Sequence, residues 1–239
     1  MNMKIVGVAL TFATLAAGCV CPRANTCDKA CACDEEGFVP LFNGKNLDGW
    51  SDMKHVYHVE NGEIVFTGGR RIFGNLFYNR PFTNFVARFE YKMKYHGNNG
   101  FAVRAGKECF DGGAMVGGYK AETDAAYNGM EIQILDNICG RDRGLKSWQF
   151  HGSIYGVVAA QHGAEKPLGE WNKEEVKVVG DEVTVVLNGK TILACSVEDI
   201  EKTPDGLEHP GLHNKSGYIG FLAHTEPTWI RNVRIKEIR

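Results

Sequence analysis

The stretch FVARFEYKMKY, residues 85–95, decides how the chain folds. Apolar residues occupy every second position, while Arg88, Glu90 and Lys92 stand between them. Because successive side chains of a β-strand point to opposite faces, this alternation predicts a strand with one face buried and the other in water. A helix would instead repeat its apolar residues about every 3.6 positions.

The same two-residue period returns in shorter segments. Asn61-Gly62 and Asn188-Gly189 are typical of tight hairpin turns, and each stands between such segments. Short helical turns are expected only around 196–203, and no internal repeat is present. Strands at short spacing with glycine-containing turns predict an all-β fold, a two-sheet antiparallel β-sandwich of the jelly-roll kind.

The segment GMEIQILDN, residues 129–137, is a strand with an unusual second face. Met130, Ile132 and Ile134 alternate with Glu131 and Gln133, and Asp136 follows closely. A carboxylate and an amide side by side are not the usual polar face of a strand. We expect the apolar face to fill the core and the polar face to line the concave outer side of a sheet. Asp136 joins that polar face only if a bulge shifts the register.

The N-terminus is expected to be an export signal. Residues 1–18 contain Lys4, a short apolar run and small residues before Cys19, as in a lipoprotein-type signal peptide. Lipidation at Cys19 would anchor an exported protein in the periplasm or at the cell surface of a bacterium, and simple secretion is the alternative. Residues 19–36 form a Cys-rich tether, for which a disulfide-tied or flexible chain is favoured over a zinc knot. The domain then spans 37–239.

The charge of the chain argues against one class of partner, and the cysteines outside the tether are expected to be structural. Without residues 1–18 the chain carries 26 basic and 29 acidic side chains, with no basic block, so a nucleic-acid partner is not expected. The expected membrane contact is the lipid anchor. Cys109, Cys139 and Cys195 are expected to be small buried residues, with a Cys109–Cys139 disulfide left open.

Several separated motifs resemble one family when they are taken in order. They are FVPLFNGKNLDGW near the start, NNGFAVRAG, GMEIQILDN, GSIYG, the hairpin GEWNKEEVKVVGDEVTVVLNGK, and GYIGFLAH with IRNVRIKEI near the end. This order resembles the 3-keto-disaccharide hydrolase domain family over about residues 37–239. The resemblance implies a concanavalin A-like jelly roll that acts on sugars whose C3 hydroxyl is oxidised to a ketone. The Cys-rich tether and the long Gly-rich segment after Cys109 depart from the family pattern.

A ketone at C3 changes how a glycosidic bond can be broken. It acidifies the proton on C2, so that a base removes this proton, the group on C1 is eliminated, and water adds back. Such a reaction needs a base, an acid for the leaving oxygen, and donors for the enolate oxygen. The substrate would be a small 3-keto-glycoside.

The candidate catalytic residues are Glu131, His224 and His151. Glu131 lies on the polar strand face, whereas both histidines titrate near neutral pH, and His224 ends a strand. The spacing around Glu131 also resembles the catalytic strand of jelly-roll glucanases. Gln133 replaces their middle acid, which weakens a mechanism that needs two carboxyls about 5–5.5 Å apart.

The candidate substrate-binding residues are polar or aromatic. Arg104 is expected on the strand face opposite to that of Phe101 and Val103. There it would bind sugar hydroxyls or stabilise an enolate, or else form an ion pair with Glu131. Sugar rings stack on aromatic faces, so Tyr155 and Trp148 are expected in the cleft, as is Tyr119, whereas Trp50 and Trp171 are read as structural. The full predicted binding set is Arg104, Gln133, Asp136, Asn99, Tyr155 and Trp148. Asn98, beside Asn99, could also bind sugar hydroxyls, or both could merely form the turn before the strand.

No cofactor is expected, since no His-x-His spacing or Asp-rich loop is present. A divalent metal held by residues distant in the sequence stays open. The leading hypothesis is therefore an exported, lipid-anchored enzyme that cleaves 3-keto-glycosides by elimination and hydration or by net hydrolysis. The alternatives are a non-catalytic carbohydrate-binding or adhesion module and a conventional jelly-roll glucanase.

Overall fold

The computed structural model describes residues 35–52, 55–69, 74–110, 122–224 and 226–239. The chain divides into two units, Met1–Glu36 and Gly37–Arg239, and the second spans the residues expected to form the domain. The expected signal peptide, Cys19 and nearly all of the tether lie outside the described residues, as does Tyr119. None of the helices in the described ranges is long and apolar enough to cross a bilayer.

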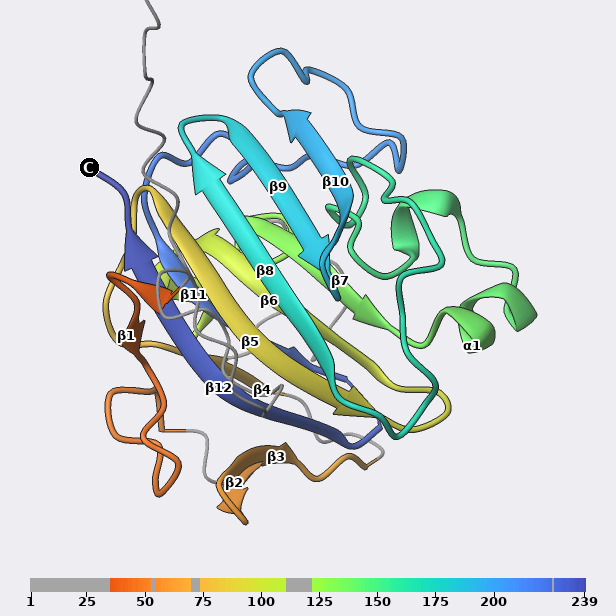
Figure 1. The fold of residues 1–239 in the computed structure, drawn as a ribbon. Helices are drawn as coiled ribbons and strands as arrows, with labels where there is room; N and C mark the ends of the chain where they lie inside the picture. Colours follow the sequence, from red (N-terminus) through yellow and green to blue (C-terminus); the bar gives the residue numbers. More distant parts are fainter. Residues whose placement is uncertain (1–34, 53–54, 70–73, 111–121, 225) are drawn as a thin grey trace, which may run out of the picture. The chain divides into compact units, whose positions relative to one another are not determined.

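The regular secondary structure of the second unit is almost entirely β-strand (Figure 1). In chain order they are β1 (Val39–Pro40), β2 (Tyr57–Glu60), β3 (Glu63–Phe66), β4 (Gly74–Phe77), β5 (Phe85–Met93), β6 (Asn98–Ala105), β7 (Met130–Leu135), β8 (Asn172–Val179), β9 (Glu182–Leu187), β10 (Lys190–Ser196), β11 (Tyr218–Ala223) and β12 (Thr228–Glu237). Helical structure in this unit is confined to α1 (Asn137–Asp142) and the 3-10 turns Lys107–Cys109 and Ser147–Gln149 within the described residues. No helical turn forms at 196–203, where one was expected.

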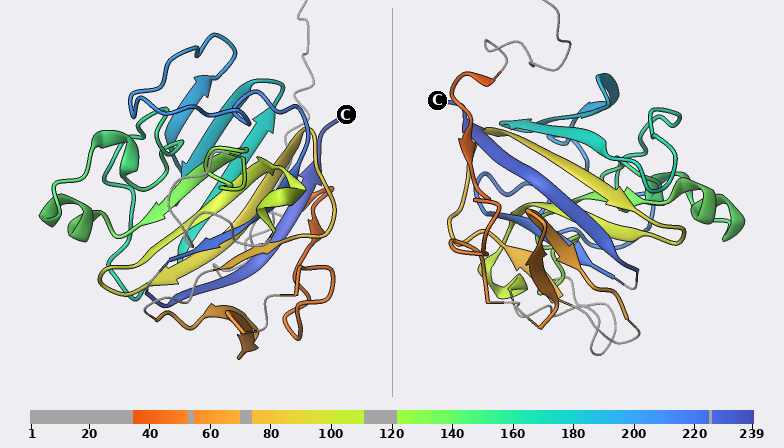
Figure 2. Two further views of the ribbon diagram at one scale, coloured as in Figure 1. Left: turned by 180° about the vertical axis from the view of Figure 1, so that it is seen from behind. Right: turned by 60° about the horizontal axis from the view of Figure 1, so that its bottom comes forward.

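The strands form two antiparallel sheets. The larger has the order β10-β9-β8-β5-β12-β3-β2, with β1 beside β12, and the smaller has the order β4-β11-β6-β7. The larger sheet lies in front of the smaller in Figure 1, and the reversed view of Figure 2 brings the smaller sheet forward. This arrangement confirms the predicted all-β sandwich of the concanavalin A-like type.

The core lies between the two sheets and follows the predicted alternation. Along β5 the odd-numbered residues are buried and the even-numbered residues are only half-buried. The ring of Phe89 lies 5.0 Å from that of Phe101 on β6 and 5.3 Å from that of Phe221 on β11. Aromatic pairs at this separation join the layers, since aromatic side chains contribute the largest buried apolar areas.

The hairpin turns are also as predicted. Asn61 and Gly62 have φ angles of 51° and 78°, and Asn188 and Gly189 have 51° and 85°. A type I′ turn requires positive φ at both central residues, which asparagine and glycine adopt most readily. These turns fix the register of β2 on β3 and of β9 on β10.

The scattered cysteines are not bridged. Cys109, Cys139 and Cys195 are all free, so the disulfide that the sequence allowed between Cys109 and Cys139 does not form. Cys109 and Cys139 are buried, as expected of small apolar residues, and Cys195 is half-buried.

Strand β7 differs from the expected half-exposed strand, because both of its faces are buried. Met130, Ile132 and Ile134 belong to the core between the sheets. Glu131 and Gln133 point to the outer side of the smaller sheet, yet only 4% and 3% of their surfaces are exposed. The loops after α1 and before β7 cover this side, and so the polar face forms the floor of a cavity rather than an open surface.

Candidate functional site

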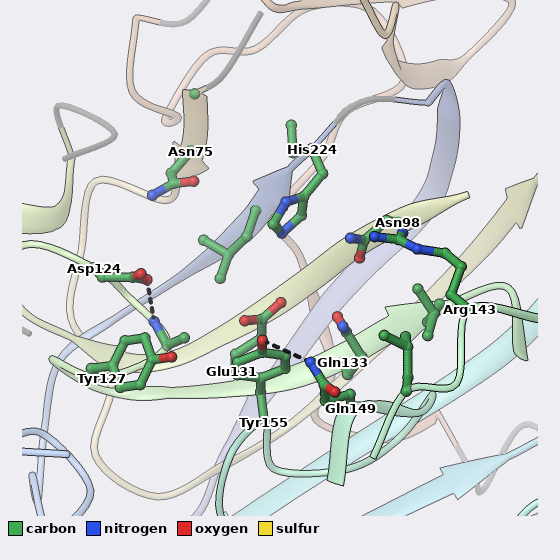
Figure 3. Close-up of a pocket in the computed structure, with 16 residues that line it drawn as sticks. Asn75, Asn98, Asp124, Tyr127, Glu131, Gln133, Arg143, Gln149, Tyr155 and His224 are labelled. Atoms are coloured by element: carbon green, nitrogen blue, oxygen red, sulfur yellow. Dashed lines mark hydrogen bonds between the residues drawn. The ribbon is translucent and has the colours of Figure 1, made fainter. Parts of the chain in front are cut away.

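A cavity of about 250 Å³ lies on the outer face of the smaller sheet (Figure 3). All four strands of that sheet contribute to it, together with the loops at 124–127 and 143–155. Its lining is Gly74, Asn75, Asn98, Asp124, Ala126, Tyr127, Glu131, Gln133, Leu135, Arg143, Leu145, Gln149, Tyr155, Leu222, Ala223 and His224. Of the predicted site residues, the structure brings together Glu131, Gln133, Tyr155 and His224.

The pairing of β6 with β7 builds the floor of the cavity. Gly100 lies opposite Gln133, and Ala102 lies opposite Glu131. A Cβ on Gly100 would lie only 2.0 Å from Oε1 of Glu131, so the missing side chain provides the space that the carboxyl occupies. Glycine is therefore needed at position 100 because a side chain there would clash with the Glu131 carboxyl, and not because of the backbone angles of Gly100.

Glu131 is the most perturbed acid of the cavity. Desolvation by burial raises the pKa of its carboxyl well above the ordinary value, and the nearby Asp124 raises it further. Among the described residues, its Oε1 atom has no hydrogen-bond partner. A buried, unpaired polar atom that faces a cavity is costly to maintain, and such atoms are concentrated at functional sites.

We expect Gly100→Ala to lower the catalytic efficiency at this site about tenfold, because the new methyl group displaces the Glu131 carboxyl. The clash involves the end of a flexible side chain, so the variant should still fold. The measurement is kcat/KM together with the unfolding temperature. In a Glu131→Gln background the same substitution should have little further effect, and an equal loss in both backgrounds would show that Gly100 acts by another route.

His224 directly follows β11 and lies across the cavity from Glu131 (Figure 3). Burial lowers the pKa of its imidazole to about 4. The ring is therefore neutral at neutral pH, with one N–H to donate and one nitrogen to accept. His224 was predicted as a catalytic residue, and it lies in the cavity lining together with Glu131.

Two amides complete the floor. Gln133 and Asn98 line the cavity, and the side-chain oxygen of each has no hydrogen-bond partner among the described residues. The sequence offered Asn98 and Asn99 together, and the structure places only Asn98 in the lining, so the choice of Asn99 for the binding set is wrong. Asn99 is fully buried, lies outside the cavity lining, and accepts a hydrogen bond from the backbone N–H of Gly100 at 2.9 Å. Alternation along β6 places Asn98, not Asn99, on the face of Glu131.

The predicted aromatic pair is only half correct. Tyr155 lines the cavity, and its hydroxyl accepts a hydrogen bond from Nε2 of Gln149 at 3.2 Å (Figure 3). Trp148 is outside the lining and packs edge-on against Tyr155, with 5.6 Å between ring centroids. Trp148 therefore supports the wall of the cavity instead of forming it.

Asp124 and Tyr127 are cavity residues that the sequence did not point to. Burial raises the pKa of Asp124, whose Oδ1 atom accepts a hydrogen bond from the N–H of Ala126 at 3.0 Å. Burial likewise raises the pKa of the Tyr127 hydroxyl. Both residues lie in an aperiodic loop before β7, where no sequence pattern distinguishes a lining residue from a solvated one. Arg143 and Gln149 were missed for the same reason, whereas Asn75 lies in the short strand β4, which the sequence analysis did not single out.

Arg104 does not contact the cavity, so its predicted role in substrate binding is wrong. It is 2% exposed, and its φ of 51° is a left-handed conformation within β6. The guanidinium turns away to donate hydrogen bonds to backbone carbonyls and to one side-chain amide. The acceptors are the carbonyl oxygens of Thr83, Gly180 and Asn214 and Oδ1 of Asn84.

Asp136 is also corrected. It is the N-cap of α1, where its side chain accepts from the N–H of Ile138 at 2.9 Å and from the N–H of His96 at 3.0 Å. A carboxylate in this position satisfies free N–H groups at a helix start. No bulge brings Asp136 to the cavity, and its role is to end β7 and start α1.

His151 lies in the core and not in the cavity, so its predicted catalytic role is wrong. Its Nδ1 accepts from the N–H of Leu135 at 3.4 Å, while Nε2 lies 3.3 Å from the Tyr91 hydroxyl and 3.6 Å from Glu174. Burial lowers the pKa of this imidazole to about 4. Burial also raises the pKa of Glu174 well above its ordinary value. Both shifts favour the uncharged form of the side chain concerned.

We expect Glu174→Gln to unfold at a higher temperature than the parent above pH 6, with a gap that widens toward pH 8. A carboxyl whose pKa is raised on folding loses stability as the pH climbs above its unfolded value of about 4.3, and glutamine has no such loss. An unpaired buried group costs on the order of 1–3 kcal/mol, so the gap should reach roughly 5 °C in a domain of this size. Thermal unfolding from pH 4 to pH 8 measures it.

The matched control is Glu175→Gln on the other face of β8, where Glu175 pairs with Arg88 at 2.6 Å. Its unfolding temperature should show no widening gap. If Glu174→Gln is less stable than the parent at every pH, then the buried pair with His151 is charged, contrary to this prediction.

Metal ligands do not gather anywhere in the described part of the chain, where no group of three His, Cys, Asp or Glu side chains is placed to hold an ion.

Known proteins share this architecture and sequence pattern. A 3-keto-disaccharide hydrolase of Bacteroides thetaiotaomicron is 27% identical over 240 residues, which cover 85% of this chain and 79% of that protein. A crystal structure of a candidate glycosyl hydrolase from Parabacteroides distasonis is 25% identical, with a TM-score of 0.69 and coverage of 84% of this chain and 99% of that one. A second from the same organism shares the fold, with a TM-score of 0.70 at 23% identity, over 86% of this chain and 96% of that one.

The 3-keto-alpha-glucoside-1,2-lyase-like domain family matches residues 37–236, which include both sheets and every residue of the cavity. The resemblance seen in the order of the motifs is thereby confirmed, and the chain belongs to this family.

Proposed function

We propose that the protein is a hydrolase-type enzyme that cleaves 3-keto-glycosides, with 3-keto-disaccharides as the leading substrates. The observation that carries the proposal is Glu131, a buried carboxyl with an unpaired oxygen on the floor of a small polar cavity. Family membership and the name of the Bacteroides relative support the substrate class. The cavity, at about 250 Å³, is smaller than pockets for drug-sized ligands at ~300–1,000 Å³, which suits a small sugar.

The chemistry starts at C2, whose proton the neighbouring ketone acidifies. Glu131 in its ionised form takes this proton, the C1–O bond breaks, and an enone remains. Water then adds to C1 and gives one proton to the carboxylate that protonated the leaving oxygen, while Glu131 returns its proton to C2, so the sum is hydrolysis. A raised pKa makes Glu131 a stronger base than an ordinary carboxylate, and the best catalytic pKa lies near the working pH.

The other cavity residues serve the charges that develop. His224, kept neutral by its lowered pKa, donates an N–H to the ketone oxygen and stabilises the enolate. Asp124, whose pKa burial raises, supplies the proton for the leaving oxygen. The amides of Gln133 and Asn98 bind sugar hydroxyls. Tyr127 and Tyr155, which line the cavity (Figure 3), flank the sugar ring.

The test is incubation with a panel of 3-keto-glucosides and their unoxidised parents, with and without chelator, followed by product mass. A free 3-keto sugar means hydrolysis, whereas a product lighter by one water means that the reaction stops at elimination. Cleavage of the unoxidised parents would instead indicate a conventional glucanase. Binding of intact glycans without any product would indicate a carbohydrate-binding module.

We further propose that the protein is exported and anchored through lipid on Cys19, in the periplasm or at the cell surface. The apolar run and the small residues before Cys19 support this. Metabolic labelling with a fatty acid should mark the expressed protein and should fail for Cys19→Ala. Equal labelling of both proteins would contradict the proposal.

A further inference from the structure

A buried acid–histidine pair lies behind the wall of the cavity. Nε2 of His209 is 3.0 Å from Oδ2 of Asp205, and the two side chains are 1% and 4% exposed. The other oxygen of Asp205 accepts from the N–H of Leu207 at 3.0 Å and lies 2.8 Å from Oγ1 of Thr203. Neither Asp205 nor His209 lines the cavity, and nothing in the proposed mechanism uses them.

The pair holds the first tyrosine of the cavity wall. The ring of His209 packs against the ring of Tyr127, with 4.6 Å between their centroids. Two residues further along, the N–H of Gly211 donates to the carbonyl oxygen of Tyr127 at 2.8 Å. One short segment therefore fixes both the ring and the backbone of Tyr127.

The same pair lies against the backbone of Gly156, which directly follows the second tyrosine, Tyr155. The N–H of Asp205 donates to the carbonyl oxygen of Gly156, the residue after Tyr155, at 3.4 Å. A Cβ on Gly156 would lie 2.3 Å from Oδ2 of Asp205 and 2.9 Å from His209, so only glycine lets the pair come this close. Tyr155 in turn packs against Tyr127 and Ala126 in one small cluster.

We propose that Asp205 and His209 are positioning residues, which hold Tyr127 and Tyr155 in the orientation that receives the sugar ring. This inference rests on the proposed function of the cavity. His209 meets Tyr127 through its ring, and its Nδ1 atom has no hydrogen-bond partner within the described ranges, so the contact orients and does not relay a proton. Because tyrosines that are already held in place lose less conformational entropy when the sugar binds, the loss of these contacts should weaken substrate affinity.

The test compares His209→Ala and Asp205→Asn with the parent on a 3-keto-disaccharide. We expect His209→Ala to raise KM about tenfold and to leave kcat within about threefold, as for a loss of uniform binding. His209→Phe, which keeps a ring against Tyr127, should recover most of the lost affinity. His213→Ala, on the same segment but exposed, is the matched control and should behave as the parent.

A second readout needs no turnover. Nitration by tetranitromethane, mapped by peptide mass, should modify Tyr127 and Tyr155 faster in His209→Ala than in the parent, with exposed Tyr95 as the reference. If the parent cleaves no 3-keto-glycoside, the proposed function fails, and the nitration rates of Tyr127 and Tyr155 alone test the positioning role. If His209→Ala does not fold, Asp205→Asn and His209→Phe carry the same measurements. Unchanged KM and unchanged nitration in folded variants overturn the inference, as does a fall confined to kcat.

Discussion

Glu131→Gln is expected to lower kcat/KM on 3-keto-glucosides by about 10²–10⁴-fold and to leave the fold intact. General bases contribute rate factors of this size, and glutamine keeps the shape of the side chain while losing its ability to accept the C2 proton. The cavity should still bind the sugar, because the amides, His224 and both tyrosines remain. The loss should therefore fall on kcat, with KM within a few-fold of the parent.

The pH dependence makes this expectation sharper. Because burial raises the pKa of Glu131, its ionised form accumulates at a higher pH than that of an ordinary carboxyl, and the parent rate should rise with pH over that range. The residual rate of Glu131→Gln should lack that rise. Stability should move the opposite way, since a carboxyl with a raised folded pKa loses stability above its unfolded pKa of about 4.3 and glutamine does not.

Glu63→Gln, on the larger sheet, is a suitable control, because Glu63 lies far from the cavity lining and pairs with Lys92 at 3.8 Å. It should keep the parent rate and the parent pH profile. Parent-like turnover by Glu131→Gln would remove this residue from the mechanism. An unfolding temperature well below that of the parent would instead mean that the carboxyl is charged and held by contacts in the folded protein.

The fold could be predicted because its signals are local. The alternation along β5 and the Asn-Gly turns at 61–62 and 188–189 each act over a few residues, and the sandwich follows from them. Helix α1 was not predicted, because it is six residues long and depends on the Asp136 cap. The cover over β7 also depends on loops whose path no period encodes, so the polar face was expected to be open.

Alternation predicted only part of the site, since Tyr155 and His224 were chosen for the chemistry of their side chains. Alternation along β7 assigned Glu131 and Gln133 to one face correctly. Along β6 the same rule favours Asn98 over Asn99, but that choice requires the register in which Gly100 lies opposite Gln133. Asp124 comes from an aperiodic loop, and its proximity to Glu131 is a product of tertiary structure that spacing in the sequence cannot show.

Arg104 shows where alternation fails. Counting from Asn98 in steps of two reaches Arg104 on the cavity face, yet its positive φ turns the side chain away. The pairing of β6 with β11 shifts register nearby, between Tyr218 and Gly220. A bulge of this kind redirects one side chain and leaves no trace in the pattern of apolar residues.

Arg104→Met is accordingly expected to destabilise the protein by about 3–5 kcal/mol without changing substrate affinity. The guanidinium donates to three backbone carbonyls, including two bonds to Thr83 at 2.6 and 2.9 Å and one to Gly180 at 2.7 Å. Arg104 itself is buried, and hydrogen bonds to a charged group contribute about 1.5–3 kcal/mol each, so the loss of several of them together is expected to cost this much. Thermal unfolding should show a decrease of roughly 10 °C or more.

Arg104→Lys should recover little of the lost stability, because an ammonium cannot reach several carbonyls at once as the planar guanidinium does. Arg143→Met is the matched control: Arg143 is exposed and lines the cavity, so its loss should spare stability and affect only substrate binding. The Arg104 and Arg143 variants therefore distinguish a role in stability from a role in substrate binding. If Arg104→Met unfolds like the parent and raises KM at a temperature where it is folded, then Arg104 reaches the substrate, and the assignment of its guanidinium to the three carbonyls is wrong.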